Sequence, residues 1–235
     1  MTTTGFQRAR STEAKQQRED AILTAARALA TDRGIRQITL TDIAAAVGMH
    51  KSALLRYFEN REQIFLRLSA EDWQDWGPAV RTALAGLETG GTVSGGTVSS
   101  AAIARTIASS LASRPVFCDL LAQAPLNLER SVSVEAVRAY KLVTHHELEG
   151  IIGAIRSLLP ALTESDAVDV IAAATSLSGA FFEIATPGPE IEALYRSDPR
   201  LAHAVVDVEP RVARMLAAMI DGLLLARRDD RVNES

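Results

Sequence analysis

The 235-residue chain is long enough for one large domain, or for a small domain joined to a larger one. Hydrophobic residues make up 47% of it and aromatic residues only 5%, which favours packed helices over a β-sandwich. The single cysteine, Cys118, excludes an internal disulfide and a cysteine-ligated metal cluster. The N-terminus lacks a signal-peptide segment and no apolar run approaches about 18 residues, so we expect a soluble, cytoplasmic protein.

The net charge of −4 is distributed unevenly along the chain. Residues 1–61 carry ten Lys and Arg against six Asp and Glu, whereas residues 62–235 carry fifteen against twenty-three. A basic N-terminal part on an acidic remainder is compatible with contact to nucleic-acid phosphates at one end only.

Residues 1–60 are predicted to form a small helical domain. A polar, flexible arm over residues 1–11 precedes a helix over about residues 12–33, whose apolar side chains recur at helical spacing. Gly34 ends this helix.

Two short helices separated by a tight turn follow. Thr39 and Asp42 have the spacing of a capping box, so Thr39 is predicted to begin the first of them. Gly48 ends it, and KSALLRYF (51–58) forms the second after only two more residues. Together with the longer helix before them, they have the layout of a helix-turn-helix.

Residues 61–235 are predicted to form a larger helical domain. Asn60 caps a helix over residues 61–76, which Gly77-Pro78 breaks before another helix ends near Leu87. A flexible loop, ETGGTVSGG, follows. Further helices are predicted at about residues 98–113, 115–123, 134–159, 164–185 and 209–228. No segment requires a sheet, so the predicted fold class is all-α.

The last two predicted helices are candidates for a dimer interface. The final helix has a continuous apolar stripe, and the helix before it is rich in Ala, Ser and Gly, which allow close helix packing. The alternative is that both helices pack into the core of a monomer. The candidate interface residues are Ile171, Thr175, Phe182, Val212, Met215, Met219 and Leu223.

The segment ITLTDIAAAVGMHKSALLRYFENREQIFLRL resembles the DNA-binding motif of TetR-family regulators. With the first helix, the resemblance covers about the first quarter of the chain. It implies a non-enzymatic transcriptional repressor: a homodimer that binds a palindromic operator in double-stranded DNA and is released by a small molecule. The second domain would then serve ligand binding and dimerisation. The residues leave open the effector, the operator, the target genes and the choice between repressor and activator.

The candidate DNA contacts cluster around the second short helix, the recognition helix in this resemblance. Its N-terminal residues would meet base edges, and hydroxyl and guanidinium groups nearby would reach phosphates. The candidates are Thr39, Thr41, His50, Lys51, Ser52, Arg56, Tyr57 and Arg61. The chain departs from the family pattern at two positions: His50 replaces a capping Ser or Thr, and Leu55 replaces a Tyr that typically contacts phosphate.

The resemblance also implies an effector pocket among the helices between about Phe65 and Leu159. Such pockets are mostly apolar with a few polar anchors. The candidate lining residues are Trp73, Trp76, Phe117, Cys118, Gln123, Asn127 and Tyr140, each of which has a core role as the alternative.

No motif points to catalysis, a cofactor or a metal. HHELE at 145–149 lacks the His-Glu-x-x-His spacing of zinc proteases and is interpreted as a solvated helix face. A phosphate-binding loop and a nucleophile elbow are absent from the sequence. The second hypothesis is a helical binding or scaffold protein whose N-terminal domain pairs with a protein. DNA affinity that falls steeply with salt would argue against it.

Overall fold

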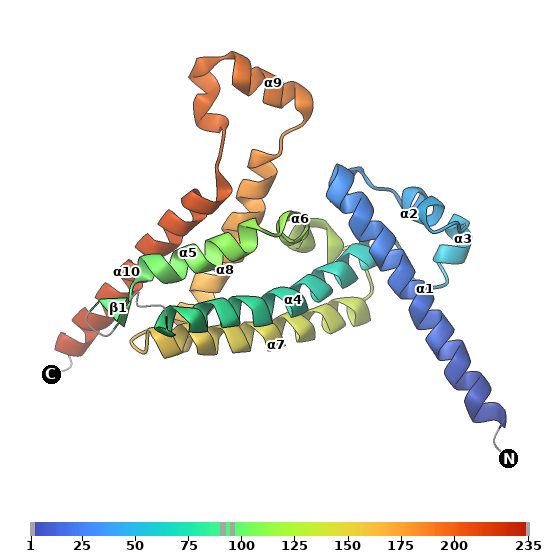
Figure 1. Ribbon diagram of the computed structural model, residues 1–235, viewed down its shortest axis with the longest axis horizontal. Helices are drawn as coiled ribbons and strands as arrows, with labels where there is room; N and C mark the ends of the chain where they lie inside the picture. The colour runs from blue at the N-terminus through green and yellow to red at the C-terminus, as the bar shows by residue number, and fades with distance from the viewer. Residues whose placement is uncertain (1–2, 90–92, 95–96, 234–235) are drawn as a thin grey trace.

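The computed structural model describes residues 3–89, 93–94 and 97–233, with side chains for 13–87 and 98–229. Within these residues the fold is helical apart from one short hairpin, in agreement with the predicted all-α class (Figure 1). The N-terminal elements are α1 (Thr3–Arg33), the 3-10 turn η1 (Ile35–Gln37), α2 (Leu40–Ala46) and α3 (Lys51–Leu54). We call this part, up to residue 60, the head.

The remaining elements form the body. They are α4 (Arg61–Thr89), β1 (Val93–Ser94), β2 (Thr97–Val98), α5 (Ser100–Ala112), α6 (Pro115–Gln123), the π-helical turn η2 (Ala124–Leu128), α7 (Val134–Leu158), α8 (Glu164–Ala185), α9 (Pro189–Ser197), η3 (Pro199–Ala204) and α10 (Val208–Asn233). Helices α4 and α7 run side by side, α5 packs on α10, and α6 packs on α8 (Figure 1). The head lies at one end of α4.

The head has its own apolar centre. Ile22 and Ala26 of α1, Ile43 of α2, Leu54 of α3 and Phe58 are all buried there. The turns that join these helices need glycine, because Gly34 and Gly48 have φ angles of 75° and 64°, which side chains disfavour. The predicted helix ends at these two glycines are therefore confirmed.

Helix α4 continues through Gly77-Pro78, so the predicted break is wrong. A proline inside a helix costs about 3 kcal/mol, because one backbone hydrogen bond is lost. Trp76, Val80 and Leu84 are fully buried on the same helix face, and burial of each such side chain is worth about 1.5–3 kcal/mol. The continuous apolar face thus outweighs the local penalty.

Gly77 also has a packing role that the sequence did not reveal. A Cβ atom at this position would lie 2.2 Å from Glu147 Oε2 of α7 and 3.1 Å from its Cβ. The glycine therefore allows α4 and α7 to approach closely where Glu147 is buried and pairs with Arg81 at 2.9 Å.

Other boundaries differ from the predictions in ways that local chemistry explains. Helix α1 begins at Thr3 and not near residue 12, because the predicted arm contains straight-chain helix formers. Helix α3 is only four residues long, and a turn follows it. In the predicted flexible loop, Val93 pairs with Val98 and Ser94 with Thr97, while residues 90–92 and 95–96 lie outside the described residues.

The proline-rich segment between α8 and α10 forms α9 and η3, which were not predicted. Pro189 and Pro199 occupy first-turn positions, where the missing N–H costs no helical hydrogen bond. No side chain of α9 is buried, and the segment projects from the body at the top of Figure 1.

Helix α8 is apolar and long enough to cross a membrane by composition alone. It nevertheless packs against α6, α7 and α10, and its first turn carries the buried Asp166, which pairs with Arg227 at 2.8 Å. We therefore interpret α8 as a core helix of the body.

Candidate DNA-binding surface and its attachment to the body

Helix α2 begins with the predicted capping box. Thr39 Oγ1 accepts from the Asp42 N–H at 3.2 Å, and the Thr39 N–H donates to Asp42 Oδ2 at 2.7 Å. These hydrogen bonds from Thr39 lower the pKa of the Asp42 carboxyl. The Thr39 hydroxyl also donates to Asp42 at 2.6 Å, so it is already engaged within the head.

His50 caps α3 in place of the expected hydroxyl residue. Its Nδ1 atom accepts from the Ser52 N–H at 3.4 Å and lies 2.9 Å from Ser52 Oγ. The imidazole nitrogen thus caps the helix in place of the Ser or Thr hydroxyl of the family pattern. Because His50 and Ser52 contact each other in these two ways, the start of α3 is ordered by local contacts.

Five of the predicted DNA contacts in α2 and around α3 are exposed to solvent. Thr41, His50, Lys51, Ser52 and Arg56 are exposed. The side chains of Lys51 and Arg56 form no hydrogen bond or ion pair with the described residues, which leaves both cations free to reach a partner.

The two remaining residues of this region differ in burial. Leu55 is also exposed, at 44%. Tyr57 is half-buried and packs against the hydrophobic core.

Arg61, a predicted phosphate contact, makes several contacts inside the head. Its guanidinium donates to the carbonyl oxygens of Ile35 and Ile38, pairs with Glu62 at 2.9 Å and lies 4.8 Å from the centre of the Phe65 ring. These contacts occupy the charged group inside the head. Arg61 therefore attaches η1 and the start of α2 to α4, and its contact with phosphate stays a prediction.

The head is joined to the body by polar contacts on two sides. On one side, Asn60 caps α4 by accepting from the Gln63 N–H at 2.9 Å, as predicted, and also donates to the Ser131 carbonyl at 2.5 Å. Next to it, Glu59 accepts from the Ser133 hydroxyl at 2.6 Å. These contacts tie the start of α4 to the segment that leads into α7.

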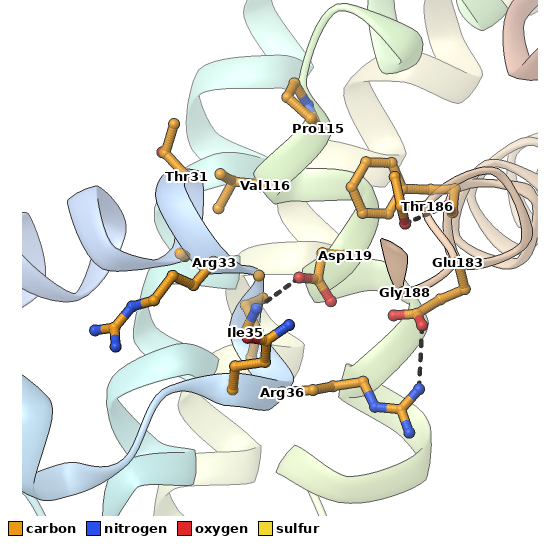
Figure 2. Close-up of a pocket in the computed structure, with 14 residues that line it drawn as sticks. Thr31, Arg33, Ile35, Arg36, Pro115, Val116, Asp119, Glu183, Thr186 and Gly188 are labelled. Carbon is orange, nitrogen blue, oxygen red and sulfur yellow. Dashed lines mark hydrogen bonds and ion pairs between the residues drawn. The ribbon is translucent and has the colours of Figure 1, made fainter. Parts of the chain in front are cut away.

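On the other side, η1 contacts α6 and α8 (Figure 2). The Ile35 N–H donates to Asp119 Oδ2 at 2.8 Å, and Arg36 pairs with Glu183 at 3.3 Å. Gln123 donates to the other oxygen of Glu183 at 2.9 Å. The connection between α1 and α2 is thus bound to body residues more than 80 positions away in the sequence.

Most of the predicted effector-pocket residues are core residues. Trp73, Trp76 and Phe117 form a buried cluster with ring centres 5.3–5.8 Å apart, and Trp76 donates to Ser110 at 2.9 Å. Cys118 is buried, and burial raises the pKa of its thiol to about 12, so the thiol stays protonated.

The other predicted pocket residues lie near openings or in polar contacts. Tyr140 lines a cavity of about 410 Å³ between α4 and α7, and Trp73 borders one of about 350 Å³ between α7 and α8. Asn127 donates to Gln123 at 2.7 Å, and these two residues line none of the principal cavities of the described part of the chain.

The predicted interface residues divide by burial. Ile171 and Val212 are buried inside the protomer and have almost no surface for a partner. Met215 is 39% exposed, and the half-buried residues are Thr175, Phe182, Met219 and Leu223.

Two family descriptions match the sequence and between them cover most of it. Residues 22–68 match the "Bacterial regulatory proteins, tetR family" description, and residues 70–227 match the "Tetracyclin repressor-like, C-terminal domain" description. The chain belongs to the TetR family. It is therefore a DNA-binding transcriptional regulator with a ligand-binding type of C-terminal domain, and members of this family are not enzymes.

One solved TetR-family structure shares the fold at low sequence identity, and two other solved regulators are similar to a lesser degree. A TetR-family transcriptional regulator from Mesorhizobium loti is 18% identical with a TM-score of 0.51, over 90% of this chain and 97% of that one. A transcriptional regulator from Pseudomonas aeruginosa is 17% identical with a TM-score of 0.49, over 91% and 94%. The fatty acid degradation regulator FadR from Bacillus halodurans is 15% identical with a TM-score of 0.45, over 85% and 94%. No curated protein matches the sequence.

Sequence reasoning missed the residues that attach this TetR head to its body. Asp119 lies in the otherwise apolar segment VFCDLLA, and a buried acid in such a segment signals a fixed partner. Its partner is a backbone N–H of η1, which no side-chain pattern could have indicated.

Proposed function

We propose that this regulator is a repressor that binds a palindromic operator as a homodimer and is released by a small molecule. The observation that supports it best is the exposed end of α3, where Lys51 and Arg56 extend without partners beside the capped His50–Ser52 turn. A recognition helix with free cations near its N-terminus can donate to guanine edges and to phosphates. Such a regulator needs access to chromosomal DNA, which supports a cytoplasmic location.

The proposed contact set is narrower than the full group of candidates. Lys51, Ser52 and Arg56 are proposed to face the major groove, with His50 fixing the angle at which α3 enters it. Thr41 and Tyr57 are proposed to contact phosphates, as is Thr39 if its hydroxyl releases Asp42.

The proposed dimer uses the outer faces of α8 and α10. Met215, Ile184 and Leu225 are large apolar side chains that are 39%, 48% and 59% exposed. Half-buried Thr175, Met219 and Leu223 lie on the same two helices and are the other candidates, whereas Phe182, also a candidate, lines the cavity between the head and the body. Large exposed apolar side chains on neighbouring helices favour an interaction site. Light scattering at micromolar concentration should give twice the protomer mass, and a monomer would contradict the dimer.

Release by a ligand is proposed to act through α4. This helix begins in contact with the head through Arg61 and borders the 410 Å³ cavity beside Tyr140 further along its length. A ligand that favours a shifted α4 would change the spacing of the two heads on the DNA.

In vitro selection of random duplex DNA by the purified protein at near-physiological salt tests the proposal. An inverted repeat whose half-sites lie about one helical turn apart, roughly 34–36 Å, or a multiple of it, is the expected result. Recovery of no enriched motif by folded, ligand-free protein would contradict operator recognition.

A further inference from the structure

A cavity of about 520 Å³ lies between the head and the body (Figure 2). One wall comes from the head, at the end of α1 and in η1, and the other comes from the start of α6 and the end of α8. It does not include the aromatic cluster or Tyr140, so it is separate from the cavity proposed for the releasing ligand.

The chemistry of this cavity is dominated by a carboxyl group with an unused acceptor. Asp119 is only 5% exposed; its Oδ2 accepts from the Ile35 N–H, while its buried Oδ1 accepts from no N–H group of the described residues. Figure 2 shows the side chains of Asp119 and Glu183 extending into the same space from α6 and α8. A buried acceptor without a donor is costly, by roughly 1–3 kcal/mol in general.

The cations at the cavity do not satisfy this acceptor. Arg36 is directed to Glu183 at 3.3 Å, and Arg33 lies within 4 Å of Asp32 and Asp42. Burial raises the pKa of Asp119 to about 6; the Ile35 N–H lowers it, and both the charge of Glu183 and a hydrogen bond with that carboxyl raise it. Asp119 and Glu183 therefore form a close pair of carboxyl groups to which no cation at the cavity donates at Asp119 Oδ1.

The remaining lining is suited to a compact apolar group. Val116 and Phe182 are half-buried at the cavity, and Ile35 is buried there. Pro115 and Thr186 complete this side.

We propose that the cavity is a binding site for a small organic cation, a primary ammonium group on a compact apolar substituent. The ammonium would donate to Asp119 Oδ1 and lie beside Glu183, while the substituent would pack on Val116 and Phe182. An anion would leave Oδ1 unsatisfied, and no group of three metal-ligating side chains exists among the described residues.

Occupation of this site would be linked to the position of the head. The head provides Ile35 and Arg36, and the body provides Asp119 and Glu183, so the ligand would contact both. Any effect on operator affinity rests on the proposed function, whereas binding itself does not, and the two can be tested separately.

The test is isothermal titration of the full chain, without DNA, at pH 7.5 with benzylamine, benzyl alcohol and benzoate. These probes share a ring and differ in charge. We expect benzylamine to bind at least tenfold more tightly than the other two. Absence of benzylamine binding in the millimolar range would overturn the proposal, as would equal binding of benzyl alcohol or preferential binding of benzoate.

Two variants assign the binding to this cavity. Asp119→Asn keeps an oxygen for the Ile35 N–H but removes the charge, and should weaken benzylamine at least tenfold. Val116→Phe fills the cavity without changing charge and should also weaken benzylamine binding at least tenfold. This second variant keeps the test decisive if Asp119→Asn does not fold. The control, Glu149→Gln on the exposed face of α7, should leave affinity unchanged. Unchanged benzylamine affinity in a folded cavity variant would overturn the proposal.

Discussion

The start of each short helix in the head and the junction between head and body are stabilised by contacts of different sequence separation. In the head, Thr39 binds Asp42 and His50 binds Ser52, so each helix start is ordered by residues two or three positions away. At the junction, Ile35 binds Asp119 and Arg36 binds Glu183, 84 and 147 positions away in the sequence. Under the proposed function, recognition would depend on local contacts in the head, whereas regulation would depend on contacts that shifts in the body can change.

Removal of the Arg61 side chain should have the largest effect on this arrangement. Arg61→Ala leaves two carbonyl oxygens of the head without their charged donor, and we expect it to lower the free energy of unfolding by about 3 kcal/mol. Urea denaturation measures this. Arg67→Ala, which removes an exposed cation from the same helix, should change it by no more than about 0.5 kcal/mol. Equal effects of both variants would show that Arg61 does not hold the head.

Gly77→Ala should test the close approach of α4 and α7. Its new Cβ would meet Glu147, so Glu147 or the helix must shift, at a cost of about 1–3 kcal/mol. Gly86→Ala in the same helix is the control, since a Cβ there meets nothing within 4 Å. A thermal melt in which both variants are as stable as the parent would contradict the packing described for α4.

Asp119→Asn should change stability in a pH-dependent way. The pKa of Asp119 is raised to about 6 from an ordinary value of 3.8, so between about pH 4 and 6 the native state holds more protons than the unfolded state. Its contribution to stability is therefore greatest below pH 4 and is lost as the pH rises through 6.

The groups that face Asp119 are Glu183 of α8 together with Arg36 and the Ile35 N–H of η1. The Asn variant should be more stable than the parent at pH 7.5, by on the order of 1 kcal/mol. This advantage should disappear near pH 4 in urea denaturation. An advantage of the same size at both pH values would contradict a raised pKa.

Substitution of His50 should give the smallest effect. His50→Ala removes the cap of α3 and should destabilise the head by about 0.5–1 kcal/mol, whereas His50→Ser restores a hydroxyl cap and should lose little. Amide hydrogen exchange at Ser52 and Ala53 would detect the change. Equal protection in the Ala and Ser variants would mean that the imidazole does not cap the helix.

The same contrast between contacts that are near and distant in sequence explains which features the sequence predicts. The capping box at Thr39, the glycine turns at Gly34 and Gly48 and the bounds of α6 and α8 follow from neighbouring residues and agree with the structure. The uninterrupted α4 does not follow from neighbouring residues, because the burial of Trp76 and Val80 against distant helices outweighs the helix-breaking effect of Pro78.

The structural roles of Arg61 and Asp119 were missed for a related reason. Both bind backbone groups of η1, and a backbone partner leaves no trace in residue identity. The core roles of Trp76 and Phe117 could not be separated from pocket roles by sequence, because both require the same apolar residues.

The most direct test of DNA recognition through α3 is the operator affinity of Lys51→Ala, Arg56→Ala measured over a range of salt concentrations. The control, Arg105→Ala, Arg138→Ala, removes two exposed positive charges from the body. We predict that the α3 variant binds operator about 100-fold more weakly than the parent, with a shallower dependence on salt, because each lost contact is worth ~1–3 kcal/mol. The control should match the parent. A folded α3 variant with unchanged affinity would contradict the account.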